Sequence, residues 1–177
     1  MLSKSIALDY AADGLRCIRL GAQRYLLATT TAAAPAVFDA LLAAGAVRAG
    51  TAAWQLGMIR AGLPLITAPT QEEFVAQMLN YELIGGVDFH KGCYPGQEIV
   101  ARAQYRGAVK RRMFRVRGAG LRTGQELFGD DAPDQPAGVI VNAAGDEALA
   151  ALPSETVEKK VAVRPAPQAA PLELLSL

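Results

Sequence analysis

The chain has 177 residues, of which 51% are hydrophobic and 20% are charged, and its formal net charge is +1. These values are typical of a soluble globular protein with one large or two small domains, and the net charge by itself indicates no polyanionic or polycationic partner. Two cysteines far apart predict no disulfide framework and favour a reducing compartment. The N-terminal residues lack the apolar core of a secretory signal, and no run approaches the roughly 20 apolar residues of a membrane span. We therefore expect a cytoplasmic protein without membrane contact.

The N-terminal part of the chain predicts three short strands and a helix. The strands cover residues 5–9, 15–20 and 24–29, with an Asp-Gly hairpin signal between the first two. Residues 33–44 are rich in alanine, carry apolar side chains at helical spacing and end before a glycine, which predicts a helix. These elements do not complete a sheet-and-helix layer. We therefore expect that the chain is the later part of a longer protein or borrows a surface from a partner.

Two further segments predict helices. Pro69 and the capping box that begins at Thr70 predict a helix over about residues 71–80. Trp54, the only tryptophan, would share a helical face with Met58, and this spacing favours burial in the core. The alternative is that the indole lies beside a pocket and offers a flat surface to a planar heteroaromatic ligand.

After residue 110 the sequence changes to short runs of strand-forming residues separated by glycine and proline. This pattern predicts a small antiparallel β-barrel or sandwich of about 60–65 residues, so we place a domain boundary between residues 109 and 110. A proline-rich stretch and a final strand at residues 172–177 would follow. The predicted strands before that point cover residues 113–117, 125–128, 137–142, 148–152 and 156–163.

The most informative segment is residues 91–98, Lys-Gly-Cys-Tyr-Pro-Gly-Gln-Glu. Its glycines permit a tight backbone path that exposes Cys93, and a helix is predicted directly afterwards, over residues 97–105. The positive end of that helix and the ammonium group of Lys91 both favour the thiolate, which indicates a functional thiol. The alternatives are a small side chain packed in a turn, or a Cys–His dyad with His90, the only histidine. One cysteine and one histidine cannot close a zinc site, and iron–sulfur ligation by this chain alone would need more thiolates, so we expect no metal centre of its own.

Basic residues gather around and after this segment. Residues 91–117 contain eight basic side chains and one acidic one, a net charge of +7, whereas residues 118–177 carry a net charge of −5. Glu98 and Arg102 have the spacing of an ion pair on one helix face. The run fits either a solvated surface or a site for a polyanion, and the sequence favours neither. The eight basic residues are Lys91, Arg102, Arg106, Lys110, Arg111, Arg112, Arg115 and Arg117.

The octapeptide, continued by Ile99-Val100-Ala101-Arg102-Ala103 and Arg106-Gly107, resembles the signature of the YgfZ family of folate-binding proteins, which are related to the glycine-cleavage aminomethyltransferase. The resemblance covers most of residues 5–152. Outside the signature it includes Trp54, the runs Ala61-Gly62-Leu63-Pro64 and Leu83-Ile84-Gly85-Gly86-Val87, and Gly138-Val139-Ile140.

The resemblance implies an α+β fold, with a partial ferredoxin-like body over residues 1–109 that carries the signature and a small β-barrel over residues 110–177. It also implies a tetrahydrofolate-type ligand and a role in maintaining iron–sulfur enzymes, including enzymes that modify tRNA. Family members are far longer, so the chain is expected to lack the first half and to hold part of the folate pocket. Carried over by position, Cys93 is the functional thiol, and the ligand-binding residues are Trp54, Lys91, Gly92, Tyr94, Gly96, Gln97, Glu98 and Arg102.

Three functions are open at this stage. The resemblance favours a non-catalytic folate-binding accessory protein that uses Cys93. A one-carbon-transferring enzyme of the aminomethyltransferase type is the second, although those transferases do not carry the cysteine octapeptide. The third is an RNA-binding module that uses the basic run, with a weak RNA contact as its minimal form.

Overall fold

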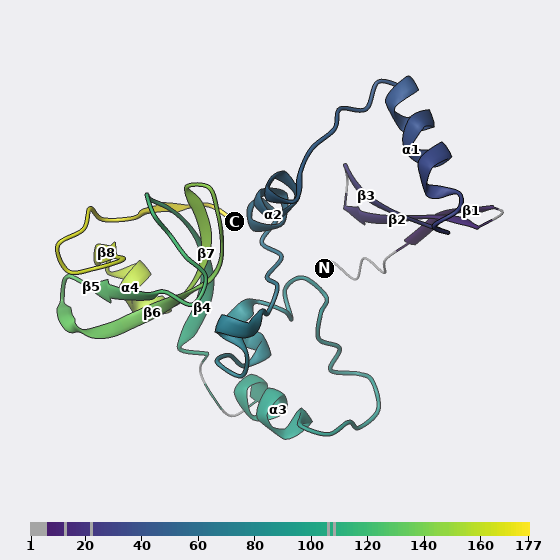
Figure 1. Ribbon diagram of the computed structural model, residues 1–177. Coiled ribbons are helices and arrows are strands. Elements are labelled where there is room, and N and C mark those ends of the chain that lie inside the picture. The colour runs from purple at the N-terminus through teal and green to yellow at the C-terminus, as the bar shows by residue number, and fades with distance from the viewer. Residues whose placement is uncertain (1–6, 13, 22, 106, 108) are drawn as a thin grey trace. The chain divides into compact units, whose positions relative to one another are not determined.

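The computed structural model describes residues 7–12, 14–21, 23–105, 107 and 109–177. The backbone forms two compact units, residues 1–49 and residues 50–177, which we describe separately. Figure 1 follows the chain from the small N-terminal sheet to the larger C-terminal one. The chain is a mixed α/β protein, and the larger unit contains a curled antiparallel sheet. The domain boundary expected at residue 109 stays a prediction.

The first unit is a three-stranded antiparallel sheet followed by a helix. Three strands are present, as the sequence predicts, and they are neighbours in chain order: β1 (Ala7–Ala12), β2 (Leu15–Gly21) and β3 (Arg24–Thr29). Residues 5 and 6 of the first expected strand lie outside the described residues. Helix α1 (Ala34–Ala43) has a proline in its first turn, where the missing N–H costs little. Among residues 14–49, no side chain that the structure describes is buried, and apolar side chains of β3 and α1 are exposed. This unit therefore has the incomplete packing that the sequence indicates.

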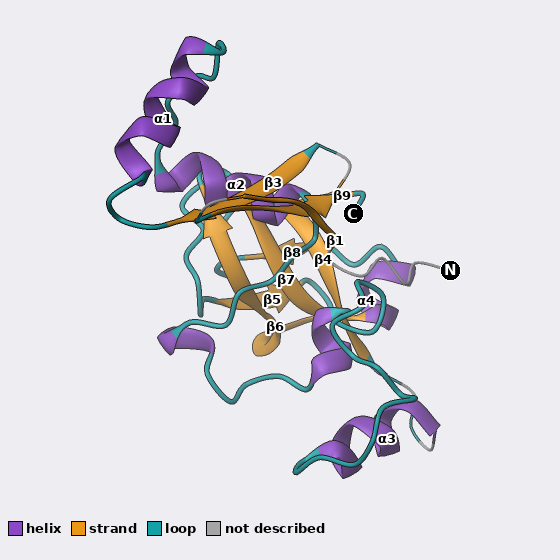
Figure 2. Cartoon of the chain, turned by 90° about the vertical axis from the view of Figure 1, so that its right-hand side faces the viewer, coloured by secondary structure: helices purple, strands orange, loops and turns teal. Residues whose placement is uncertain are grey.

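The second unit is built on a six-stranded sheet whose neighbouring strands are all antiparallel (Figure 2). Its strand order is β8-β5-β6-β7-β4-β9, so the strands at the two edges come last in the sequence. The sheet curls into a half-barrel, and the Leu172 N–H donates a 2.8 Å hydrogen bond to the Val163 carbonyl that links the two edges. The strands are β4 (Arg111–Arg117), β5 (Glu126–Gly129), β6 (Ala132–Ala144), β7 (Glu147–Pro153), β8 (Val163–Arg164) and β9 (Glu173–Leu175).

Both faces of this sheet are covered, as strand β7 shows most clearly. Ala148, Ala150 and Leu152 belong to one apolar cluster, which also includes side chains of β4, β5, β6 and β8. Leu149 and Ala151 belong to a second cluster, on the other face. Because side chains alternate between the faces of a strand, a strand buried on both faces is apolar throughout, as residues 148–152 are.

Helix α2 (Thr51–Arg60) packs against the outer face of β6 and β7, where Ile59 joins the second cluster. The guanidinium of Arg60, at the end of this helix, donates a 2.8 Å hydrogen bond to the buried Glu147 carboxylate. Arg115 lies 3.9 Å from the same carboxylate and also donates to the Arg60 carbonyl. The hydrogen bond from Arg60, with the charges of Arg60 and Arg115, holds the pKa of Glu147 below its ordinary value although burial opposes this. Glu147 thus ties α2 to the sheet.

The helix expected over residues 71–80 is wrong. The segment has a short 3₁₀ turn, η2 (Ala76–Leu79), and a second 3₁₀ turn, η1 (Ala68–Thr70), precedes it. The capping box lies earlier than predicted, between Thr67 and Thr70, whose side chains cap each other's backbone. Glu72 has a φ of +65°, which a continuous right-handed helix cannot include. Buried hydrogen bonds of η2 to other elements, described below, outweigh local helix propensity here.

The strand expected over residues 156–163 is also wrong. Helix α4 (Ser154–Glu158) occupies its first part, and β8 begins only at Val163. In the helical form Thr156 is buried, Val157 packs against the core cluster, and Glu155 pairs with Lys159 one turn later. The final strand is confirmed as β9, which pairs with β4.

We predict opposite effects of the same substitution at Gly138 and Gly57. A Cβ atom at Gly138 in β6 would lie 2.4 Å from the Ala151 carbonyl oxygen of β7, so Gly138→Ala should lower the free energy of unfolding by about 1–3 kcal/mol. A Cβ at Gly57 in α2 meets no atom within 4 Å, and Gly57→Ala should stabilise the protein by about 0.5–1 kcal/mol. Urea denaturation measures both, and an equal effect of the two variants would contradict this account of the β6–β7 packing.

The Glu147 carboxylate should make stability depend on pH. Since its pKa is lowered in the folded state, its contribution is complete above the ordinary glutamate value of about 4.3 and is lost as the pH falls through the lowered value. We expect the unfolding free energy to fall less steeply on acidification in Glu147→Gln than in the parent protein. Glu126→Gln, at an exposed carboxylate of β5, is the matched control. Parallel curves for Glu147→Gln and the parent protein would refute this role of Glu147.

Candidate functional site

The octapeptide forms a folded loop before helix α3 (Gln97–Tyr105). The Tyr94 N–H donates to the Gln97 side-chain oxygen at 3.2 Å, and the Gln97 N–H donates to the Tyr94 carbonyl at 3.3 Å. Gly96 lies between them with a φ of +82°, a conformation that side chains disfavour. The predicted helix is confirmed, and Tyr94, Gly96 and Gln97 together determine how the chain enters it.

Cys93 is exposed within this loop. The Lys91 ammonium lies over the Tyr94 ring, 4.2 Å from its centroid, so the residues on either side of Gly92-Cys93 contact each other. A Cβ at Gly92 would meet no atom within 4 Å, which shows that this glycine serves an open turn and not a close contact. The loop therefore presents the thiol to solvent instead of packing it.

His90 lies beside Asp88. Its backbone N–H donates to the Asp88 carboxylate at 2.8 Å, its Nδ1 lies 3.7 Å from the same oxygen, and its side chain is 99% exposed. Among the contacts of the described residues, none joins His90 to Cys93. The geometry gives a Cys–His dyad no support.

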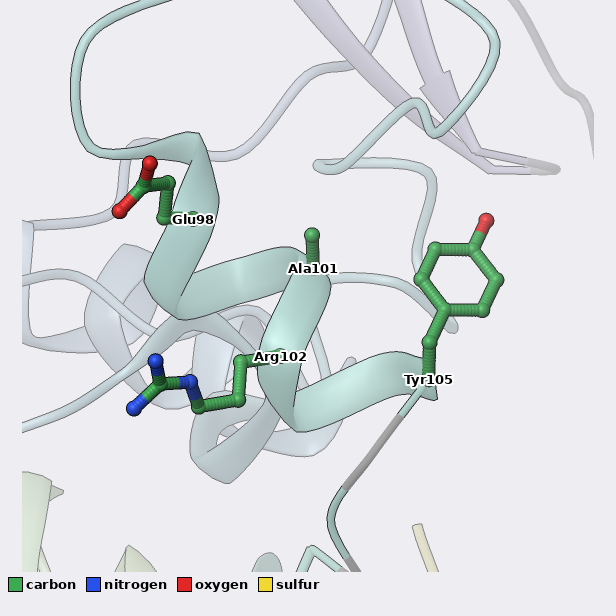
Figure 3. A pocket seen from close by; sticks show the side chains of 4 residues that line it. All are labelled: Glu98, Ala101, Arg102 and Tyr105. Atoms are coloured by element: carbon green, nitrogen blue, oxygen red, sulfur yellow. The ribbon is translucent and has the colours of Figure 1, made fainter.

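Helix α3 has no fully buried residue, although Gln97, Val100, Ala101 and Ala103 are half-buried. A concave surface of about 350 Å³ is lined by Glu98, Ala101, Arg102 and Tyr105. Figure 3 shows the Arg102 guanidinium and the Tyr105 ring extending to opposite sides of the helix. The Glu98 carboxylate points away from the Arg102 guanidinium, and the ion pairs of the described residues do not include this pair (Figure 3). Glu98 and Arg102 thus share a helix segment without neutralising each other.

The basic run is partly neutralised inside the protein. Arg112 pairs with Glu82, Arg115 lies near Glu147, and Arg117 lies 3.2 Å from Glu173. These three arginines belong to β4 and hold together elements of the second unit. Arg106 lies outside the described residues. The net charge of +7 counted from sequence is therefore not the charge of one open surface, which weakens the case for a polyanion site.

Trp54 is not a core residue, contrary to the interpretation that its spacing favours. Its side chain is 44% exposed and lines a cavity of about 210 Å³ between α2, the segment after it and the sheet. Asn142 of β6 fixes one wall, because its amide accepts from the Leu65 N–H at 2.8 Å and donates to the Leu65 carbonyl at 2.6 Å. The lining residues are Trp54, Gln55, Met58, Ile59, Leu63, Leu65, Thr67, Thr123, Asn142 and Ala143.

The structure thus divides the predicted site residues between two places. Lys91, Gly92, Cys93, Tyr94, Gly96 and Gln97 build one loop, with Glu98 and Arg102 on the helix that follows, and none of them lines the Trp54 cavity. Sequence reasoning missed Thr67, Thr123 and Asn142. Asn142 had a weak signal, as a polar residue at the end of a predicted apolar strand.

No group of three or more His, Cys, Asp and Glu side chains in the described part of the chain is placed to hold a metal ion. In the same part of the chain, none of the helices has both the length and the apolar character that crossing a membrane requires.

Curated proteins named tRNA-modifying protein YgfZ are similar to this chain. The protein from Cronobacter sakazakii is 41% identical over 106 residues, which are 60% of this chain and 32% of that protein. The protein from Edwardsiella ictaluri is 44% identical over 99 residues, 56% of this chain and 30% of that protein. The protein from Klebsiella pneumoniae is 40% identical over 100 residues, 56% of this chain and 30% of that protein.

No protein-family model matches the chain. The chain spans about a third of the length of the curated relatives it matches. The similarity extends over more than half of this chain, well beyond an octapeptide. It therefore confirms, for the matched part, the resemblance to YgfZ proteins that the signature around Cys93 indicates.

Proposed function

We propose that this chain acts in tRNA modification, as a cytoplasmic folate-binding accessory protein that helps maintain iron–sulfur enzymes through the thiol of Cys93. The observation that carries the proposal is the exposure of Cys93 on a loop whose shape its own neighbours determine. The name of the relatives supports the connection with tRNA modification. The ferredoxin-like body over residues 1–109 is part of the same proposal.

The loop suits a thiol that meets a partner from solution. The thiolate is the form of cysteine that acts as nucleophile and metal ligand. Cys93 lies four residues before the start of α3, and Lys91 adds a positive charge within the same loop. Since the thiol is exposed, its partner is a group on another molecule, such as an iron–sulfur enzyme, and not a residue of this loop.

The lining of the Trp54 cavity supports the proposal that it holds one end of a folate. An indole face suits stacking with a flat heteroaromatic ring, and the cavity walls are mostly apolar with a few polar groups, including Thr67 and Asn142. Its volume of about 210 Å³ is below the roughly 300–1,000 Å³ of pockets that enclose whole drug-sized ligands. These residues would hold the ring system, and the remainder of the folate would lie outside the cavity. The folate contacts carried over to residues 91–98 and Arg102 would then involve that remainder or another molecule.

The two alternative functions have less support. Internal ion pairs of Arg112, Arg115 and Arg117 reduce the basic surface that an RNA-binding module would use. An aminomethyltransferase-type enzyme would need a group that reacts at the folate ring, and the Trp54 cavity has no carboxylate or thiol among its lining residues. Folate-dependent turnover that survives Cys93→Ser would nevertheless favour the enzyme.

Folate binding predicts a change in the fluorescence of Trp54, the only tryptophan of the chain. Titration with tetrahydrofolate should quench this fluorescence in a saturable way, because the ring would stack on the indole. Calorimetry should show that Trp54→Ala weakens binding by about tenfold or more. Tyr25→Ala, at an aromatic residue of β3 that is exposed to a similar degree and lines neither the cavity nor the surface of α3, is the matched control and should bind normally. Equal affinities of the two variants would exclude this cavity as the folate site.

The role of Cys93 predicts different outcomes for the two cysteines. In cells that depend on this protein, Cys93→Ser should lower the amount of the affected modified nucleoside in tRNA several-fold, whereas Cys17→Ser should leave it unchanged. Mass spectrometry of digested tRNA measures both. Full modification with Cys93→Ser, at an equal level of protein, would show that the exposed thiol has no part in the function.

A further inference from the structure

Gln77 in η2 is a buried polar residue that neither the loop nor the cavity accounts for. Its side chain is fully buried, and its Nε2 donates a 2.6 Å hydrogen bond to the Val100 carbonyl in the middle of α3. Its Oε1 has no hydrogen-bond partner among the described residues. A buried amide with an unpaired oxygen is less favourable than an apolar side chain of the same size. Stability alone therefore does not explain a glutamine at this position.

The contact matters because α3 has little else to hold it in place. No residue of α3 is buried, and the helix packs against η2. The edge-to-face contact of the Tyr105 ring with Phe89, at 6.2 Å, joins α3 to the segment just before the octapeptide. Among the side-chain hydrogen bonds of the described residues, the one from Gln77 is therefore the link between α3 and the core of the second unit.

On its other side, η2 is firmly attached to the sheet. Asn80 has a left-handed φ of +57°, and its Nδ2 donates to the Met113 carbonyl of β4 at 2.9 Å. Arg112 of β4 donates to the Gln77 carbonyl at 3.1 Å, and Leu79 is buried in the same cluster as Met113. One short turn thus joins the sheet to α3, and Gln77 takes part on both sides.

We propose that Gln77 is a positioning residue for the thiol of Cys93. Its hydrogen bond holds α3 at Val100, and one turn earlier the reciprocal Tyr94–Gln97 hydrogen bonds transmit that position to the loop. The inference rests on the proposed function only in treating Cys93 as the working thiol. Its geometric content, that Gln77 orders α3 and the Cys93 loop, can be tested without any client enzyme.

The test uses the full chain with Cys17→Ser, so that Cys93 is the only thiol. Gln77→Met keeps the size of the side chain and removes the donor. We expect amide hydrogen exchange in residues 97–105 to accelerate about three- to tenfold, with exchange in β6 and β7 unchanged. Alkylation of Cys93 by iodoacetamide at neutral pH should slow about two- to fivefold, because a loosened loop no longer holds the thiol at its exposed position. Gln104→Met, the same change at an exposed residue of α3, is the matched control and should change neither rate.

A second variant keeps the inference testable if Gln77→Met does not fold. Gln97→Ala removes the Tyr94–Gln97 lock at the surface, and it should slow alkylation of Cys93 while exchange at Val100 stays protected. Normal alkylation in both Gln77→Met and Gln97→Ala would overturn the inference. If these variants slow alkylation but Cys93→Ser leaves tRNA modification intact, the positioning role stands and the proposed function fails. If Cys93→Ser abolishes modification and Gln77→Met changes neither exchange nor alkylation, the proposed function stands and the positioning role of Gln77 fails.

Discussion

The burial of strand β7 on both faces is the constraint on which the larger unit depends. A strand in a barrel whose outer surface faces solvent needs only one apolar face, the inner one. Residues 148–152 of β7 are enclosed on both faces. The inner face completes the cluster within the curled sheet, and the outer face needs a cover. Helix α2 and turn η2 provide that cover through Ile59 and Leu79. The elements that carry the Trp54 cavity and lead to the Cys93 loop are therefore present first of all because the sheet must be covered.

Polar side chains then decide where these covering segments lie. Apolar packing has no direction, whereas a hydrogen bond to a backbone group fixes one position. Asn142 fixes the backbone at Leu65, Asn80 fixes η2 on β4, and Gln77 fixes α3. Glu147 does the same for the end of α2 through Arg60. Gln77, Asn80 and Glu147 are buried, so their hydrogen bonds face less competition from water than the exposed pair of Asn142 and Leu65. The irregular part of the fold is thus held by a few side chains more than by regular secondary structure.

The sequence predicts the parts of the fold that local rules determine. The hairpin strands before residue 30, helix α3 and most strands of the sheet follow from turn residues and apolar patterns, and the structure has them. The structure of residues 71–80 could not be predicted from local patterns. Their side chains have helical spacing, but they form hydrogen bonds with residues distant in sequence, Val100 and Met113, and these contacts determine the backbone. The prediction that Trp54 is a core residue is wrong for a similar reason. A helical stripe indicates which side faces the protein, but whether that side meets a full core or a cavity depends on the partner surface, here on β6.

The separation of the Cys93 loop from the Trp54 cavity has a consequence for mechanism. None of the residues of the loop lines the cavity, and no described contact joins the two. If a folate ring occupies the cavity and Cys93 is the working thiol, the thiol does not attack the ring within this chain. The ligand would then act on the position or ordering of neighbouring elements, or the thiol and the ligand would meet on a second molecule. In the first case the coupling would run through the segment that leaves α2, passes η1 and η2, and reaches α3, because this segment borders the cavity at Leu65 and Thr67 and holds α3 at Gln77. The segment from α2 to α3 includes residues 71–80, whose structure local sequence does not predict. In that case it is also the segment through which a ligand in the Trp54 cavity would affect the Cys93 loop.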